Sequence, residues 1–76
     1  MTIDKSGLTD DEKLLAEQCE NAINGIRNSL FSGLAVLNDA NIYGIIQSKI
    51  PESEQTAISN IITDGAALQA YIDAQP

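Results

Sequence analysis

The stretch of sequence that decides the fold is TDDEKLLAEQCENAINGIRNSLFSGLAVLN, residues 9–38. Apolar residues recur in it at intervals that are almost all three or four, which is the period of one face of an α-helix. They are Leu15, Cys19, Ala22, Ile23, Ile26, Leu30, Leu34 and Leu37. The pattern predicts one continuous helix to about Asn38, with a bend near Gly25 or Gly33. A break at Gly33 is the alternative, because an unbroken helix of this length exceeds the diameter of a compact domain.

A helix start precedes this stripe. The Thr9 side chain is placed to accept a hydrogen bond from the backbone of Glu12, whose carboxylate reaches back to Thr9, as in a capping box. Acidic residues in the first turn also suit the positive end of the helix dipole. The sequence therefore predicts a flexible N-terminal arm over residues 1–8 and a single helical domain over residues 9–76.

Two further helices are predicted in the second half of the chain. Residues 42–50 carry isoleucines at helical spacing and predict a short helix, with a β-strand as the competing interpretation. A last helix begins at Pro51 and ends near Ala74. Its apolar seam repeats at intervals of three and four residues. The seam comprises Ile58, Ile61, Gly65, Leu68 and Ile72.

The expected fold is all-α: a long helix, a short helix and a long helix packed antiparallel on the first, as a small bundle or an elongated hairpin. A domain of 76 residues has a small core and usually needs a disulfide, a metal or oligomerisation for stability. Cys19 is the only cysteine and histidine is absent, which argues against an internal disulfide and against a zinc or haem site. Oligomerisation is the remedy that remains, and no cofactor or metal is expected.

The composition disfavours several function classes. The formal net charge of −7 disfavours binding to nucleic acid or to an anionic membrane. Without histidine, the acidic residues form no recognisable set of nucleophile and base, so no catalytic residue is assigned. The chain shows no signal-peptide pattern and no apolar run of about 20 residues. We therefore expect a soluble protein of the cytoplasm or of a virion.

Small residues at helical spacing are the main candidates for a contact surface. Gly25, Ser29 and Gly33 lie four residues apart and, on one helix, share a face without side-chain bulk. Ala66, Ala70 and Ala74 repeat the spacing near the end of the chain. Such a face packs helix one on helix three, forms a seam between copies of the chain, or acts as a hinge.

Arg27 and Phe31 are the first candidates for an interaction site, and Gly65 in the seam of the last helix is a further one. Arg27 has no acidic residue three or four positions away, so its partner lies on another element, on another chain or in solvent. Arginine is enriched at the hot spots of interfaces.

Three side chains with polar or reactive atoms are assigned to the core. Cys19 lies on the apolar stripe and is expected to be a small buried residue rather than a reactive thiol. Tyr43 and Tyr71 are expected to be half-buried, each with a hydrated hydroxyl.

Three short motifs resemble those of acyl carrier proteins, which are acidic helical domains of nearly this length. They are Asn28-Ser29-Leu30, Ile50-Pro51-Glu52 and Ala70-Tyr71-Ile72. In that family the serine of Asp-Ser-Leu holds the phosphopantetheine arm, so the resemblance implies a modified Ser29. This chain departs from the family pattern in two ways: Asn28 replaces the aspartate, and Ser29 falls inside the predicted first helix instead of at a helix start.

Together these features favour a non-enzymatic helical protein–protein interaction or structural module that self-associates. Small proteins of this kind are common among viral and phage virion or accessory components. An acyl-carrier-like protein with a modified Ser29 is one alternative. The other is an acidic inhibitor of a basic partner protein, which would use the acidic residues of the first helix. These are Asp10, Asp11, Glu12, Glu17 and Glu20.

Overall fold

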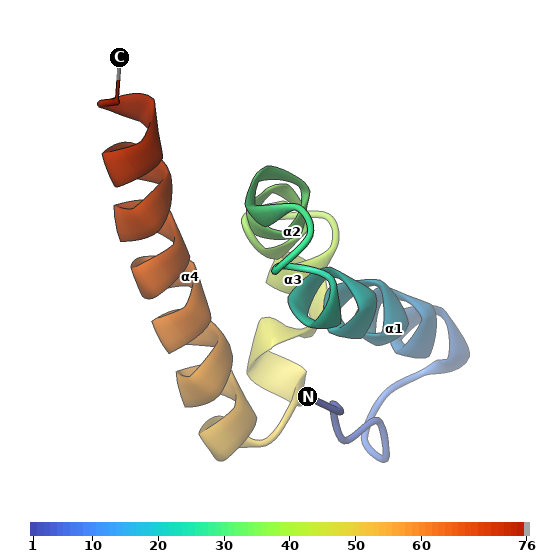
Figure 1. The fold of residues 1–76 in the computed structure, drawn as a ribbon. Helices are drawn as coiled ribbons and strands as arrows, with labels where there is room; N and C mark the ends of the chain where they lie inside the picture. Colours follow the sequence, from blue (N-terminus) through green and yellow to red (C-terminus); the bar gives the residue numbers. More distant parts are fainter. Residues whose placement is uncertain (76) are drawn as a thin grey trace.

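The structure, a computed structural model, describes residues 1–75 of the chain (Figure 1). Those residues form four α-helices and one 3-10 turn and contain no β-strand. The helices are α1 (Asp10–Asn24), α2 (Leu30–Leu37), α3 (Tyr43–Ile46) and α4 (Glu52–Asp73), and the 3-10 turn η1 (Gln47–Lys49) follows α3. The predicted all-α fold class is confirmed.

The first helix begins where the sequence places it. Thr9 is the N-cap of α1, and its side-chain oxygen accepts a hydrogen bond from the backbone N–H of Glu12 at 3.3 Å. The Glu12 carboxylate in turn accepts a hydrogen bond from the backbone N–H of Thr9 at 2.9 Å. The capping box is therefore complete, and the predicted helix start is confirmed.

The predicted continuous first helix is wrong, because the chain breaks between α1 and α2. Gly25 ends α1 as its C-cap, residues 25–28 form a turn, and Ser29 begins α2 as its N-cap. The Ser29 side-chain oxygen accepts a hydrogen bond from the backbone N–H of Ser32 at 3.3 Å. Asparagine, glycine and serine favour turns and caps over helix interiors, and this preference outweighs the continuity of the apolar stripe. The alternative break at Gly33 is also wrong, since Gly33 lies inside α2.

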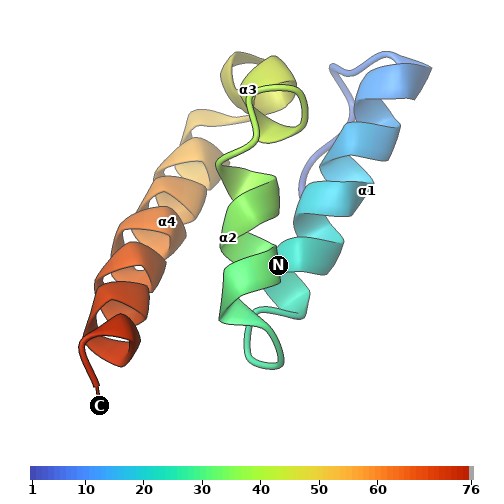
Figure 2. The ribbon, with the colours of Figure 1, turned by 90° about the horizontal axis from the view of Figure 1, so that it is seen from above.

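The break lets the two halves of the stripe face each other. Figure 2 shows α2 between α1 and α4, running in the opposite direction to both. The last helix therefore packs antiparallel on only the second half of the stretch predicted as helix one, which is α2. The molecule measures 45 × 20 × 19 Å, because α4 has 22 residues against 8 in α2 and extends past it.

Residues 42–50 are helical, and the competing interpretation as a β-strand is wrong. They form α3 and η1, and they bring Ile46 and Ile50 into the core with exposed fractions of 0% and 4%. Helix α4 begins directly after Pro51 and ends with Ala74 as its C-cap, which confirms both predicted ends of this helix.

One apolar core joins all four helices to the N-terminal segment. Its buried members are Ile3, Leu8, Ala16, Cys19, Ile23, Leu37, Tyr43, Ile46, Ile50 and Ile58. Cys19 is fully buried, as its place on the stripe predicts, and burial raises the pKa of its thiol to about 11. The thiol is therefore a packing group and lacks the exposure and thiolate character that reactive cysteines have.

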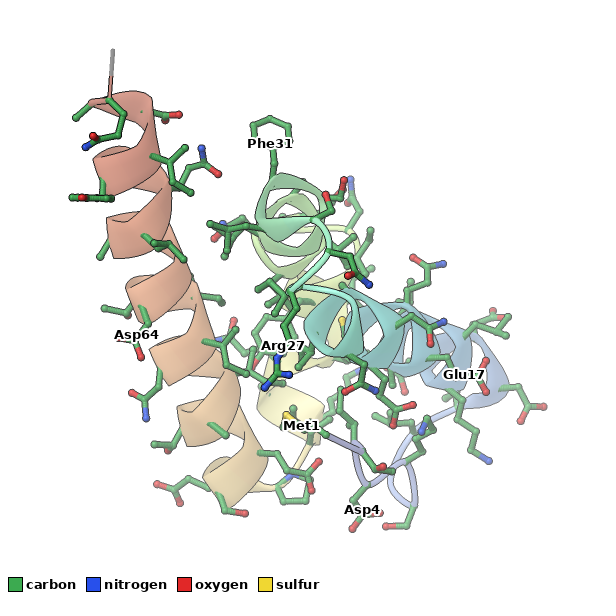
Figure 3. The ribbon with its side chains drawn as sticks, viewed as in Figure 1. Met1, Asp4, Glu17, Arg27, Phe31 and Asp64 are labelled. Carbon is green, nitrogen blue, oxygen red and sulfur yellow. The ribbon has the colours of Figure 1, made fainter. Side chains whose placement is uncertain are left out.

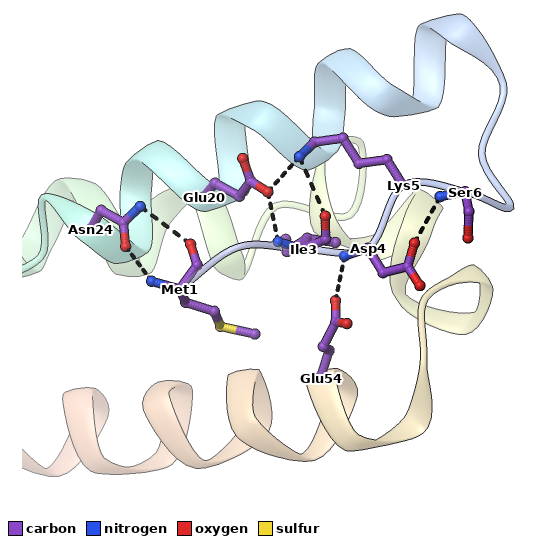
Figure 4. Close-up of polar contacts among 8 residues, drawn as sticks. All are labelled: Met1, Ile3, Asp4, Lys5, Ser6, Glu20, Asn24 and Glu54. Carbon is purple, nitrogen blue, oxygen red and sulfur yellow. Dashed lines mark hydrogen bonds and ion pairs between the residues drawn. The ribbon is translucent and has the colours of Figure 1, made fainter.

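Residues 1–8, for which the sequence predicts a flexible arm, contribute Ile3 and Leu8 to this core. Figure 4 shows the polar contacts that accompany them. The backbone N–H of Ile3 donates to Glu20 of α1 at 2.6 Å, and the backbone N–H of Asp4 donates to Glu54 of α4 at 2.8 Å. The N-terminal segment thus connects α1 to the first turn of α4.

The environment of Tyr43 differs from the predicted one. The residue is only 4% exposed, and its hydroxyl has no hydrogen-bond partner among residues 1–75. The expected half-buried position with a solvent-exposed hydroxyl is therefore wrong for Tyr43, and burial raises the pKa of the phenol. An unpaired buried hydroxyl costs about 1–3 kcal/mol of folding free energy, which the packing of the aromatic ring offsets.

Replacement of Tyr43 by phenylalanine is expected to stabilise the domain by about 1 kcal/mol, because it removes the unpaired hydroxyl and keeps the ring. The measurement is the urea midpoint of unfolding followed by circular dichroism. Tyr71→Phe is the control and should leave the midpoint unchanged, since Tyr71 is 66% exposed. A lower midpoint for Tyr43→Phe would show that the hydroxyl has a partner, such as a buried water.

Candidate functional site

Two glycines, Gly33 and Gly65, allow α2 to pack closely against α1 and α4. A Cβ atom on Gly33 would lie 3.0 Å from the carbonyl oxygen of Ala22 and 3.1 Å from Cγ1 of Ile26. A Cβ atom on Gly65 would lie 2.7 Å from Cδ2 of Leu34. Glycine therefore permits α2 to approach α1 on one side and α4 on the other. Both close contacts lie within a single chain.

Gly25 and Ser29 have a different role from Gly33. They cap the adjoining ends of α1 and α2, so the three small residues do not share one helical face as the sequence predicts. Ser29 is exposed at the N-terminus of α2. The alanines of the C-terminal repeat, Ala66, Ala70 and Ala74, are exposed as well.

An apolar groove lies between α4 on one side and α2 with the α1–α2 turn on the other. Its volume is about 470 Å³. It is lined by Ile26, Arg27, Leu30, Ile61, Asp64, Gly65, Leu68 and Ile72. All of these except Arg27 and Asp64 are apolar or glycine, so the groove offers apolar contact area with one charge of each sign. We call this surface the α2–α4 groove.

The charged residues of the groove come from different elements. Arg27 lies in the turn between α1 and α2, and Asp64 lies on α4 (Figure 3). Neither side chain forms an ion pair, with the other or with any other of residues 1–75. The sequence-based expectation that Arg27 has no partner on its own helix thus extends to the whole described part of the chain.

The lysines differ from Arg27, because each of them pairs with an acidic residue of α1. The pairs are Lys5–Glu20, Lys13–Asp10 and Lys49–Glu12. Three of the acidic residues proposed as a binding surface for a basic partner are therefore engaged within the chain. Lys13–Asp10 is an exposed pair at 3.9 Å, whereas the Glu12 and Glu20 side chains are only 11% and 16% exposed.

Hydrogen bonds lower the pKa of two of these carboxyl groups. For Glu12 the largest cause is the hydrogen bond from Lys49, followed by the bond from the backbone N–H of Thr9. For Glu20 burial acts in the opposite direction, but the bonds from Lys5 and from the backbone N–H of Ile3 outweigh it, so its pKa is lowered too. Both arrangements favour the ionised carboxylate. They therefore stabilise the folded state at any pH above the pKa that the carboxyl group has in the unfolded chain.

The Glu12–Lys49 pair leads to a pH-dependent prediction. Glu12→Gln keeps an acceptor for the Thr9 N–H but loses the charge, so at pH 7 the variant should melt at a lower temperature than the wild type. Because folding lowers the pKa of Glu12 from 4.5, the stabilisation is complete above pH 4.5 and is lost as the pH falls through the lower folded value. The difference in melting temperature should therefore disappear in acid.

The matched control for this prediction is Glu17→Gln. Glu17 is exposed on the same helix and forms no ion pair within residues 1–75, so its replacement should change the melting temperature little at any pH. Thermal melts of the three proteins between pH 3 and pH 8 make the comparison. A Glu12→Gln deficit that stays constant down to pH 3 would contradict the assignment.

An apolar surface continues from the groove to the far end of α4. Leu68 is 51% exposed, Ile72 is 49% exposed and Tyr71 is 66% exposed. The predicted half-buried position is wrong for Tyr71, because α2 is too short to cover this end of α4. On α2, Phe31 is 75% exposed and lines a second, smaller hollow with Leu34 and Gln69.

The charged residues that line the groove are one arginine and one aspartate. No three histidine, cysteine or carboxylate side chains gather in a cluster within residues 1–75. The residues predicted from the sequence as an interaction site lie in different parts of the structure. Arg27 and Gly65 line the groove, whereas Phe31 lies on the exposed side of α2 and Gly33 is buried against α1. The candidates therefore do not form one continuous site.

Sequence reasoning missed Asp64 as a residue of the site. Its signal is its position on α4, because it lies three residues after Ile61 and four before Leu68 in the apolar seam. A charge in that position lies at the border of the seam and is exposed to solvent. The seam itself was recognised, but its exposure beyond Gly65 was not.

None of the helices within residues 1–75 is sufficiently long and apolar to cross a lipid bilayer. Comparisons of the chain with protein-family models, with curated proteins and with solved structures gave no match.

Proposed function

We propose that this protein is a non-enzymatic helical interaction module that self-associates through the α2–α4 groove and the apolar end of α4. The observation that carries the proposal is the pair Leu68 and Ile72, which stay about half exposed although they continue the same seam as the buried Ile58. Monomeric soluble proteins rarely expose contiguous apolar surface of this kind, and where they do it commonly marks an interaction site.

The size of the expected effect follows from the buried area. Full burial of a leucine or isoleucine side chain contributes about 1.5–3 kcal/mol, so covering the exposed halves of Leu68 and Ile72 contributes roughly half of that for each residue. In a symmetric dimer both copies bury these two residues, so each residue contributes twice. This contribution is comparable to the cost of holding two chains together, so the apolar end of α4 is sufficient to influence the assembly.

The test of the proposal compares two leucines of similar exposure. Leu68→Ser removes apolar area from the groove, whereas Leu14→Ser removes it from α1, where Leu14 is 58% exposed. We expect Leu68→Ser to raise the dissociation constant of self-association by about tenfold or more, as measured by sedimentation equilibrium. Leu14→Ser should behave as the wild type. Equal effects of both variants would contradict the placement of the interface.

A second function is favoured by the position of Ser29. The sequence alone placed this residue inside a helix, but it is the exposed N-cap of α2 and it directly precedes Leu30, which lines the groove. This removes one of the two departures from the acyl carrier pattern, while Asn28 still replaces the aspartate of that pattern. An acyl-carrier-like role with a modified Ser29 is therefore the second proposal.

The carrier role is tested by incubation of the protein with coenzyme A and a phosphopantetheinyl transferase, followed by measurement of the intact mass. A carrier protein gains the mass of one phosphopantetheine arm, and Ser29→Ala abolishes the gain. Ser32→Ala, three residues further along α2, is the matched control and should leave the labelling unchanged. No gain in mass, or a gain that survives Ser29→Ala, eliminates this role.

A further inference from the structure

The seam of α4 is covered over only part of its length. Ile58 is fully buried in the core, and Gly65 is in close contact with Leu34 of α2. Beyond Gly65 the same seam continues through Leu68 and Ile72, which are 51% and 49% exposed. The spacing of three and four residues does not change at this point, so the exposed half has the same apolar pattern as the half that already packs against a helix.

The groove also carries two charges without partners. Arg27 lies on one wall and Asp64 on the other, and neither forms an ion pair within residues 1–75. All other basic side chains of the chain, its three lysines, are paired. The occupant that best matches the groove therefore supplies apolar side chains together with a negative group near Arg27 and a positive group near Asp64.

A second copy of the chain meets these requirements better than other occupants. In a two-fold symmetric contact, residue i of one copy meets residue j of the other and the reverse, so a surface with one arginine and one aspartate is complementary to itself. A uniformly basic or acidic partner would place a like charge against Arg27 or Asp64. A purely apolar ligand would cover both charges without pairing them, which is unfavourable.

We propose that a second copy of this chain occupies the α2–α4 groove, with Leu68 and Ile72 of each copy packed in the groove of the other and Arg27 of each copy paired with Asp64 of the other. This inference rests on the proposed self-association and specifies its geometry. The proposed dimer places its two-fold axis perpendicular to α4, so that the two α4 helices run antiparallel.

The required area is compatible with the size of the chain. A stable interface buries about 800 Å² per partner, which is about one sixth of the 4853 Å² accessible surface of this structure. The groove supplies only part of this area. Tyr71, which lies seven residues after Asp64 and is 66% exposed, extends the same side of α4 and supplies more.

The ion pairs set the register of the dimer more than its affinity. Both charged side chains lie near solvent, where a pair contributes little net free energy, whereas two like charges held against each other are clearly unfavourable. Charge reversal at one position is therefore a stronger test than neutralisation. Arg27→Asp leaves two aspartates facing each other in both contacts of a homodimer, and Asp64→Arg leaves two arginines facing each other.

The experiment compares the single variants with their equimolar mixture by sedimentation equilibrium. We expect the dissociation constant of each homodimer to rise by about tenfold or more. In the mixed dimer, Asp at position 27 faces Arg at position 64 and Arg27 faces Asp64, so both contacts are attractive and dimerisation should return. Lys13→Asp and Asp11→Arg make the same changes in net charge on the exposed surface of α1 and serve as controls.

The outcomes separate this inference from the proposal on which it rests. A wild type that dimerises, variants that do not, and a mixture that does support the reciprocal pairing. A wild type and single variants that dimerise equally well would overturn the pairing and leave self-association intact. A wild type that stays monomeric at all concentrations would overturn both.

Discussion

Ile58→Ala is expected to destabilise the domain by about 2–5 kcal/mol, which is the range for truncation of a fully buried isoleucine. Ile58 has no exposed surface, and it is the one α4 side chain among the fully buried members of the core. The free energy of unfolding of a small domain lies near the low end of about 5–15 kcal/mol. The substitution should therefore remove much of the total stability, and α4 should lose its attachment to the core.

Urea unfolding followed by circular dichroism measures this loss directly. Ile45→Ala is the control, because Ile45 is 43% exposed and lies outside the core cluster. Its replacement should shift the midpoint only slightly. If Ile58→Ala and Ile45→Ala shifted the midpoint equally, α4 would not be packed through Ile58 and the arrangement of the four helices would be wrong.

Gly33→Leu is the second substitution with a large expected effect, at or above the upper end of the range of about 1–3 kcal/mol for overpacking. The new Cβ atom would lie 3.0 Å from the carbonyl oxygen of Ala22. A backbone oxygen cannot rotate away as a side chain can, so α2 must move away from α1. The contact at Gly65 is more forgiving, because there the nearest atom is Cδ2 of Leu34, at the end of a flexible side chain.

The control for Gly33→Leu is Gly44→Leu. Gly44 is exposed in α3, and a Cβ atom there would lie 3.5 Å from that of Ala40, an ordinary contact. We expect this variant to unfold at a urea concentration equal to or above that of the wild type, since glycine is the weaker helix former. A Gly33→Leu variant as stable as Gly44→Leu would contradict the close approach of α1 and α2.

The parts of the fold that local signals specify could be predicted from the sequence. The capping box at Thr9 fixes the start of α1, and Pro51 with the acidic residues after it fixes the start of α4. Each of these signals lies within a few residues of the feature that it determines. Such local signals do not depend on how the rest of the chain packs.

The break between α1 and α2 was missed because two signals conflict there. The apolar spacing continues through Ile26 and Leu30, which predicts a single helix, while Gly25 and Ser29 favour a helix end and a helix start. The prediction of a continuous helix follows from the periodicity alone. In the structure a turn separates α1 from α2. Because α2 folds back along α1, both halves of the stripe are buried within one chain.

The exposure of the groove could not be read from the sequence at all. The spacing of the seam is the same before and after Gly65, yet Ile58 is buried and Ile72 is half exposed. The difference arises from the unequal lengths of α2 and α4, and the length of α2 depends on the break after α1, which the apolar spacing does not predict. Arg27 has no acidic residue three or four positions away, as the sequence shows, but that it lines the same groove as Asp64 is a property of the folded chain.

Self-association through the α2–α4 groove is tested most directly by the molar mass of the wild-type protein in solution, measured by light scattering behind size exclusion over a wide range of concentrations. Self-association predicts a mass of twice the 8.1 kDa of the chain at high concentration and a fall toward 8.1 kDa on dilution. A mass of 8.1 kDa at every concentration would contradict self-association through the α2–α4 groove.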